Sequence, residues 1–197
     1  MQLAIIITAF LLVFAPVSAQ KGKAKTQNPP SVQEAVRARA QGFLAARQTH
    51  KGAVARRYCN SNDVKKIHDD LKLLYASTID GLKKGQFTPD DIKRSVEEGT
   101  LAEPYKQAVL RYLLKNADFD REMDLAFTSY MVTLPYKITK FQINKVVILS
   151  DGKTAETHVA EYRQGPGQKQ PDLVSVVYKW KFINDNWYLY IDRSLEF

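Results

Sequence analysis

Apolar residues in the first two thirds of the chain recur every three or four positions, the spacing that gathers them on one face of a helix. Ser31 and Glu34 have the spacing of a capping box, in which each side chain satisfies a free backbone donor at a helix start. The first helix is therefore expected to begin at Ser31. Its repeating face consists of Val32, Val36, Ala40, Phe43 and Arg47.

Further helices are expected before the pattern changes. A short helical segment over 53–58 precedes a long helix, which is predicted to run from a cap at Asn62 or Asp63 to Gly85. Its apolar face is formed by Val64, Ile67, Leu71, Leu74, Tyr75, Thr78 and Leu82. Three shorter helices follow, and their starts are expected at Thr88-Pro89, before Tyr105 and at Asp118.

The spacing of apolar residues changes to two after Pro135, which indicates strands. Two strands are expected over 136–150 and 153–164, joined by Asp151-Gly152 as a tight hairpin turn. The clearest alternation belongs to a third strand, with Val174, Val176, Tyr178, Trp180 and Phe182 on its buried side. A fourth strand follows Asn184-Asp185-Asn186. The sequence thus predicts an α+β fold in which N-terminal helices pack on a curved four-stranded antiparallel sheet.

The start of the chain is typical of an exported protein. Residues 1–19 carry no charged side chain, and residues 3–14 form an almost wholly apolar run, too short to span a bilayer. Val17-Ser18-Ala19 places small side chains where a signal peptidase cleaves. We therefore expect a signal peptide removed after Ala19, with an uncleaved anchor as the alternative, and a secreted or periplasmic location.

The mature chain divides into a leader and one domain. Residues 20–30 are rich in Lys, Gln, Asn and Pro without apolar periodicity, which is typical of a flexible basic leader. A single α+β domain is expected over 31–197, with helices in 31–131 and the sheet in 136–197. The chain carries 29 Lys and Arg against 21 Asp and Glu, a net charge of +8. Such charge suits contact of the leader with an anionic membrane surface, whereas nucleic acid is disfavoured by the exported destination and by the lack of a recognised motif.

Three segments carry a family resemblance. The first helix ends in Phe43-Leu44-Ala45-Ala46-Arg47, residues 53–58 read Ala-Val-Ala-Arg-Arg-Tyr, and the last two strands meet in Trp180-Lys181-Phe182-Ile183-Asn184-Asp185-Asn186-Trp187-Tyr188. Over residues 31–58 and 136–197 these features resemble the nuclear transport factor 2-like superfamily, which includes SnoaL-like proteins. The resemblance implies a long helix and a curved sheet that form a cone with a pocket at its wide end. The helices expected over 63–130 exceed that compact pattern.

That superfamily contains dehydratases, isomerases and cyclases beside many non-catalytic binding domains, so the fold alone does not decide the function. Its catalytic members commonly use an Asp and His pair, or a Tyr and Asp, inside the cone. No short motif here fixes those roles, and no catalytic residue is assigned from the resemblance. Members often pair through the open face of the sheet, which makes a homodimer through the sheet an expected assembly.

Candidate site residues come from the helical and strand faces. His68 lies on or beside the buried face of the long helix, where a hydrogen-bonded histidine at the edge of the core is the expected role. The alternative is a general base with Asp69, Asp70 or a later tyrosine as partner. Tyr178, Trp180 and Phe182 are expected as sheet core first and as the wall of a ligand pocket second. With Tyr75 they form the candidate ligand-binding set.

Cys59 is the sole cysteine, which excludes an intramolecular disulfide and any zinc site built on several cysteines. It is expected to be a small buried hydrophobe rather than a reactive thiol. The three histidines lack metal-ligand spacing. The alternating acids over 118–124 are better explained by a helix start than by a calcium loop, because Met123 and Ser129 stand where that loop needs glycine and glutamate. No metal and no cofactor are expected.

Together these patterns favour an exported non-catalytic domain that binds a small apolar ligand or a protein partner. The alternatives are a proton-transfer enzyme of the dehydratase or isomerase type, with His68 as its base, and an envelope-surface protein held by its basic leader.

Overall fold

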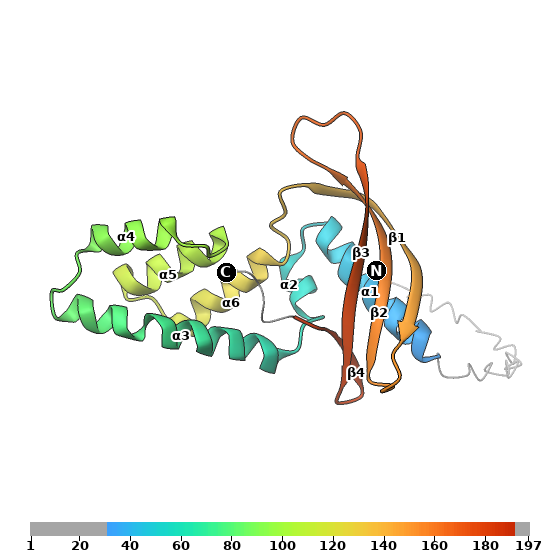
Figure 1. The fold of residues 1–197 in the computed structure, drawn as a ribbon, viewed down its shortest axis with the longest axis horizontal. Coiled ribbons are helices and arrows are strands. Elements are labelled where there is room, and N and C mark those ends of the chain that lie inside the picture. The colour runs from blue at the N-terminus through green and yellow to red at the C-terminus, as the bar shows by residue number, and fades with distance from the viewer. Residues whose placement is uncertain (1–30, 192–197) are drawn as a thin grey trace, which may run out of the picture.

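The computed structural model describes residues 31–191 and contains six helices followed by a four-stranded antiparallel sheet in that range (Figure 1). The predicted α+β fold, with N-terminal helices packed on a four-stranded antiparallel sheet, is confirmed. The expected signal peptide and basic leader lie outside the described residues, as does the segment 192–197. No described helix combines the length and the apolar composition that crossing a membrane requires.

Local capping signals explain where most helices begin. The helices are α1 (Val32–Gln48), α2 (Gly52–Arg56), α3 (Ser61–Lys83), α4 (Pro89–Glu98), α5 (Glu103–Lys115) and α6 (Phe119–Tyr130). The expected capping box at Ser31 and Glu34 is present, and Thr88 and Asp118 cap α4 and α6 as predicted. The predicted cap of α3 is wrong by two or three positions. Asn60 is the cap, because its side-chain oxygen accepts from the amides of the two residues that were expected to cap.

The sheet is a meander in which each strand pairs with its neighbours along the chain. Its strands are β1 (Lys137–Ile148), β2 (Thr154–Gln164), β3 (Asp172–Ile183) and β4 (Asn186–Leu189), in that spatial order. The predicted hairpin turn joins β1 to β2. Gly152 has a φ of 63°, a left-handed conformation that favours glycine, and Asp151 accepts from the amides of Lys153 and Thr154.

Helix α1 lies along one face of the sheet and contacts β1, β2 and β4 (Figure 1). Five of its residues are buried, namely Val36, Ala40, Phe43, Leu44 and Ala46, whereas Val32 of the predicted face is 52% exposed. The ring of Phe43 meets the rings of Tyr178 and Trp180 edge-on, at centroid distances of 5.6 and 6.1 Å. Such aromatic contacts add to the hydrophobic stabilisation from the buried area. The amphipathic pattern of α1 therefore creates the interface between helix and sheet.

Polar side chains of α1 also reach the first strand. The register of β1 against β2 shifts between Ile138 and Lys140, and again between Ile143 and Lys145. Gln48 donates from Nε2 to the carbonyl of Thr139 at 2.8 Å, and Arg37 donates from Nη1 to the carbonyl of Ile143, also at 2.8 Å. A bulge leaves a residue outside the regular ladder, so α1 supplies hydrogen bonds at both irregularities.

Helices α3 to α6 extend away from the sheet, and we call residues 61–130 the helical arm (Figure 1). Helix α2 joins the arm to the rest of the fold by packing against both α1 and α6. The far part of α3 is less covered than its sequence predicts. Leu74 belongs to the expected apolar face but is 63% exposed, because α3 packs only sparsely against the other described elements. It lines a hollow with Tyr75 and Leu101.

Candidate functional site

A cavity of about 420 Å³ lies where the helical arm meets the sheet. Its walls come from α1, from α6 and the segment 131–135 after it, from β3, and from the end of β4. The apolar lining consists of Phe43, Phe127, Met131, Leu134, Pro135, Leu189 and Ile191. The polar lining consists of Arg47, Tyr130, Thr133, Tyr178 and Tyr190. A volume of this size with a mostly apolar wall and a few polar groups is characteristic of small-molecule sites.

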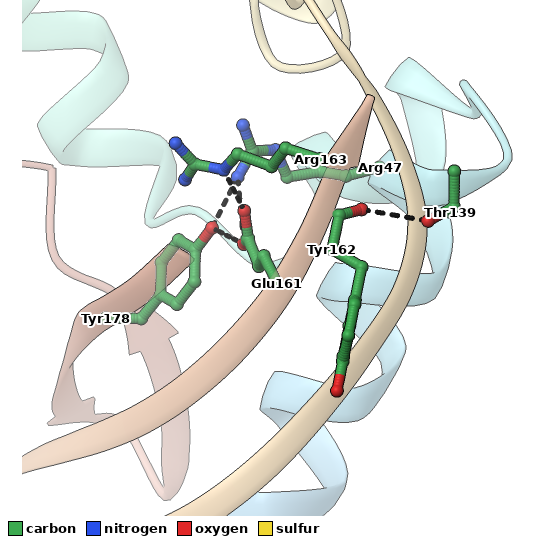
Figure 2. A network of polar contacts seen from close by, with 6 residues as sticks. All are labelled: Arg47, Thr139, Glu161, Tyr162, Arg163 and Tyr178. Carbon is green, nitrogen blue, oxygen red and sulfur yellow. Dashed lines mark hydrogen bonds and ion pairs between the residues drawn. The ribbon is translucent and has the colours of Figure 1, made fainter. Parts of the chain in front are cut away.

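A buried carboxylate, that of Glu161, contacts the cavity residues Arg47 and Tyr178 (Figure 2). Glu161 of β2 is 0% exposed and shares its strand face with the buried residues Ala155, Thr157 and Val159. Arg163 donates from Nε to Oε2 of Glu161 at 2.8 Å, and Tyr178 of β3 donates its hydroxyl proton to Oε1. Both carboxylate oxygens are therefore hydrogen-bonded, as a buried charged group requires.

Arg47 of α1 completes this cluster from the opposite layer. Its Nη1 donates to the hydroxyl of Tyr178 at 2.5 Å and lies 4.0 Å from Oε1 of Glu161. The phenol thus accepts from a guanidinium and donates to a carboxylate. Burial raises the pKa of Tyr178, Glu161 raises it further and Arg47 opposes the shift, so the hydroxyl keeps its proton and serves as a link.

Arg163 is held in place from a second side. Its guanidinium carbon lies 4.3 Å from the ring centroid of Tyr136, a cation–π contact at the start of β1. Figure 2 shows the Arg163 and Arg47 side chains meeting Glu161 and Tyr178, while Thr139 bonds the backbone of Tyr162 at the neighbouring strand. The arrangement offers several donors toward the cavity and keeps its only carboxylate fully occupied. It can orient a polar group of a ligand but presents no free base or nucleophile.

The candidate ligand-binding residues do not come together at one place. Tyr178 lines the cavity. Trp180 is 0% exposed and lies in the core, where its indole nitrogen donates to Thr157 at 3.1 Å. Phe182 was expected on the buried side of its strand, but it is 37% exposed and packs on Trp187 near the end of β3. Tyr75 lines the separate hollow on the helical arm.

His68 also lies away from the cavity. It lines a smaller hollow of about 260 Å³ with Arg56, Lys65, Asp120 and Asp124. It is buried as expected, but its Nε2 has no hydrogen-bond partner among the described residues, contrary to the expected hydrogen-bonded role. Its acidic neighbours in this hollow belong to α6, whereas the residues considered as partners were Asp69, Asp70 or a later tyrosine.

Glu161, Arg163 and Arg47 are not among the predicted site residues, although two features of the sequence point to them. Alternation along β2 places Glu161 on the buried face with Val159, where a carboxylate requires partners. Arg47 belongs to the repeating apolar face of the first helix. A charged residue on each of two facing apolar surfaces predicts an ion pair between them. Arg47 and Glu161 are more than a hundred residues apart, however, so no short motif in the sequence indicates that they meet.

The remaining chemistry of the described residues is sparse. Cys59 is buried, and burial raises the pKa of its thiol to about 12, so it acts as the small hydrophobe that was expected. The described residues contain no group of three or more His, Cys, Asp or Glu side chains that could hold a metal ion. Comparison of the chain with protein families, with curated proteins and with solved structures finds no match.

Proposed function

We propose that this protein is a binding domain that holds a small, mostly apolar molecule in the cavity between the helical arm and the sheet. The observation that carries the proposal is the cavity of about 420 Å³, whose wall combines seven apolar residues with a few fixed polar groups. Apolar surface that stays open to water at such a site gives a ligand the hydrophobic driving force for binding. The expected export of the chain and the resemblance to a superfamily with binding members are compatible with this role.

Several residues of the wall are held in place by contacts within the chain. Phe43 and Arg47 are fixed by the packing of α1 on the sheet, and Tyr178 is fixed by hydrogen bonds on both sides of its hydroxyl. Leu189 belongs to β4, where its amide donates to the carbonyl of Tyr58 at 2.7 Å. A preformed cavity loses little conformational entropy on binding, which favours tight retention of a small molecule.

The proposal is tested by filling the cavity. Leu134→Trp places a large ring in the wall, and Leu173→Trp makes the same change at a position that is 61% exposed on β3, outside the cavity. We expect the unaltered chain and Leu173→Trp to bind the neutral dye Nile red with equal affinity, and Leu134→Trp to bind it at least about tenfold more weakly.

Fluorescence titration of Nile red measures these affinities, and native mass spectrometry of protein from its own host shows whether a small molecule is retained. Equal dye affinity of the two variants would contradict the proposal. So would a loss of dye binding in Leu173→Trp but not in Leu134→Trp.

A further inference from the structure

The charges around the cavity do not balance. Among the described residues that line it, Arg47 alone carries a charge. Glu161 is the only acidic side chain within 4.0 Å of either Arg47 or Arg163 in the described part of the chain. Two guanidinium groups therefore share one carboxylate, which leaves one positive charge of the cluster without a counter-ion among the described residues.

This excess charge lies on the cavity side of the cluster. Arg163 is the closer partner of Glu161, with its Nε at 2.8 Å, whereas the nearest nitrogen of Arg47 is 4.0 Å away. The side chain of Arg47 is 12% exposed, so water compensates its charge only in part. A charge in such surroundings interacts with an added counter-ion more strongly than it would in bulk water.

Arg47 also has donors to spare. A guanidinium carries five N–H groups in a planar fork, and the described residues take one of them, in the hydrogen bond to Tyr178. The fork matches the two oxygens of a carboxylate, which is why Arg and carboxylate groups often pair through two parallel hydrogen bonds. Tyr130 and Tyr190 line the same cavity.

We propose that the ligand of this cavity is an amphipathic acid, with a single carboxylate at Arg47 and an apolar body against Phe127, Met131 and Leu189. The inference rests on the proposed binding function and specifies its ligand class. One negative charge neutralises the cluster, and the apolar body buries the remaining wall. Glu161 holds Tyr178 and Arg163 in place and competes with the ligand for Arg47.

The test compares octanoate with 1-octanol, which share their alkyl chain and differ in the charged head. We expect isothermal titration calorimetry at neutral pH to show that the unaltered protein binds octanoate about ten- to a hundredfold more tightly than 1-octanol. In Arg47→Met this preference falls to about one, because the guanidinium is lost while the stem still packs.

Two further variants sharpen the comparison. Arg37→Met removes another guanidinium of the same helix, one that bonds the backbone of Ile143 and does not line the cavity, so the preference for octanoate should be unchanged. Glu161→Gln removes the competing carboxylate and should increase the preference. If Glu161→Gln fails to fold, the comparison of Arg47→Met with Arg37→Met still decides the matter.

The outcomes separate this inference from the binding function on which it rests. If octanoate and 1-octanol bind equally well and Arg47→Met changes nothing, the carboxylate site is wrong while the apolar cavity stands. If neither compound binds and Nile red does not bind, the cavity is not a binding site at all. Loss of the preference in both Arg47→Met and Arg37→Met would also overturn the inference, because it would show a nonspecific charge effect.

Discussion

At the scale of single residues, His68 shows how burial changes the chemistry of a side chain. It is 6% exposed, and its ring meets that of Phe127 edge-on at 6.3 Å. Burial lowers its pKa, Arg56 lowers it further, and Asp124, Asp120 and Asp69 oppose the shift without overcoming it. The imidazole of the folded protein is therefore neutral at neutral pH, whereas that of the unfolded chain gains a proton more readily.

This difference makes the free energy of unfolding depend on pH. The contribution of His68 is fully present above the unfolded pKa of about 6.5 and is lost as the pH falls from there through the lower folded pKa, because the unfolded chain then binds the extra proton. We expect urea unfolding to show a smaller loss of stability between neutral pH and about pH 5 in His68→Gln than in the unaltered protein. His158→Gln, at a half-exposed position on β2, serves as the control and should retain the original loss. An identical loss in all three proteins would contradict the assignment.

The sequence predicts the burial of such residues better than their partners. Helical spacing places His68 on the buried face of α3, and strand alternation places His158 opposite the buried residues of β2, as the structure shows. What spacing along one element cannot predict is the side chain that arrives from another element. Asp124 approaches His68 from α6, and Arg47 approaches Glu161 from α1, because of packing between distant parts of the chain.

Among the helices, the contact between α2 and α6 depends on Gly52, which has no side chain. A Cβ atom at Gly52 would lie 2.4 Å from the backbone carbonyl oxygen of Thr128 on α6, far closer than such atoms approach one another. Glycine is thus required here for close approach of two backbones. Because α2 joins the helical arm to α1, this contact helps fix the arm next to the sheet.

We expect Gly52→Ala to destabilise the protein by about 2 kcal/mol, because backbone cannot move aside as easily as a flexible side chain. Gly165→Ala is the matched control, since the nearest atoms there belong to the flexible side chain of Gln168 and the closest lies 3.3 Å away. Chemical denaturation of both variants measures the difference. Equal free energies of unfolding for Gly52→Ala and the unaltered protein would show that α2 and α6 can move apart without destabilising the fold.

The elements themselves are mostly predictable because their signals are local. The capping boxes at Ser31 and Thr88, and the turn at Asp151-Gly152, depend on residues within a few positions of one another. The exposure of Leu74 is not predictable in this way. Its helical spacing is correct for an apolar face, but whether that face is covered depends on where α4 and α5 come to lie.

At the scale of the whole molecule, the helical arm and the sheet differ in how well they are supported. Strand β2 is paired on both sides and covered by α1, whereas α4 packs mainly on α5 and buries only Ile92 and Val96. Regions with few buried apolar contacts open locally at lower free energy than the core. The arm is therefore expected to unfold locally before the sheet.

Hydrogen–deuterium exchange tests this expectation without altering the chain. We expect the amides of α4 to exchange at least about a hundredfold faster than those of the middle of β2, because local unfolding of the arm costs less free energy than opening of the sheet. Addition of octanoate should slow exchange in α6, which forms part of the cavity wall, more than in α4. Uniform exchange across both parts of the chain would mean that they open together.

The two register shifts of β1 affect how readily the protein aggregates at high concentration. An edge strand offers unpaired amides and carbonyls to any other strand, and a long flat edge is a starting point for aggregation. β1 is a twelve-residue edge strand, but its register is broken twice and Arg37 and Gln48 already occupy carbonyls beside both breaks. Exposed lysines at 137, 140 and 145 add charge along the same strand. The register shifts of β1 and the hydrogen bonds from α1 thus also disfavour growth of the sheet into a fibril.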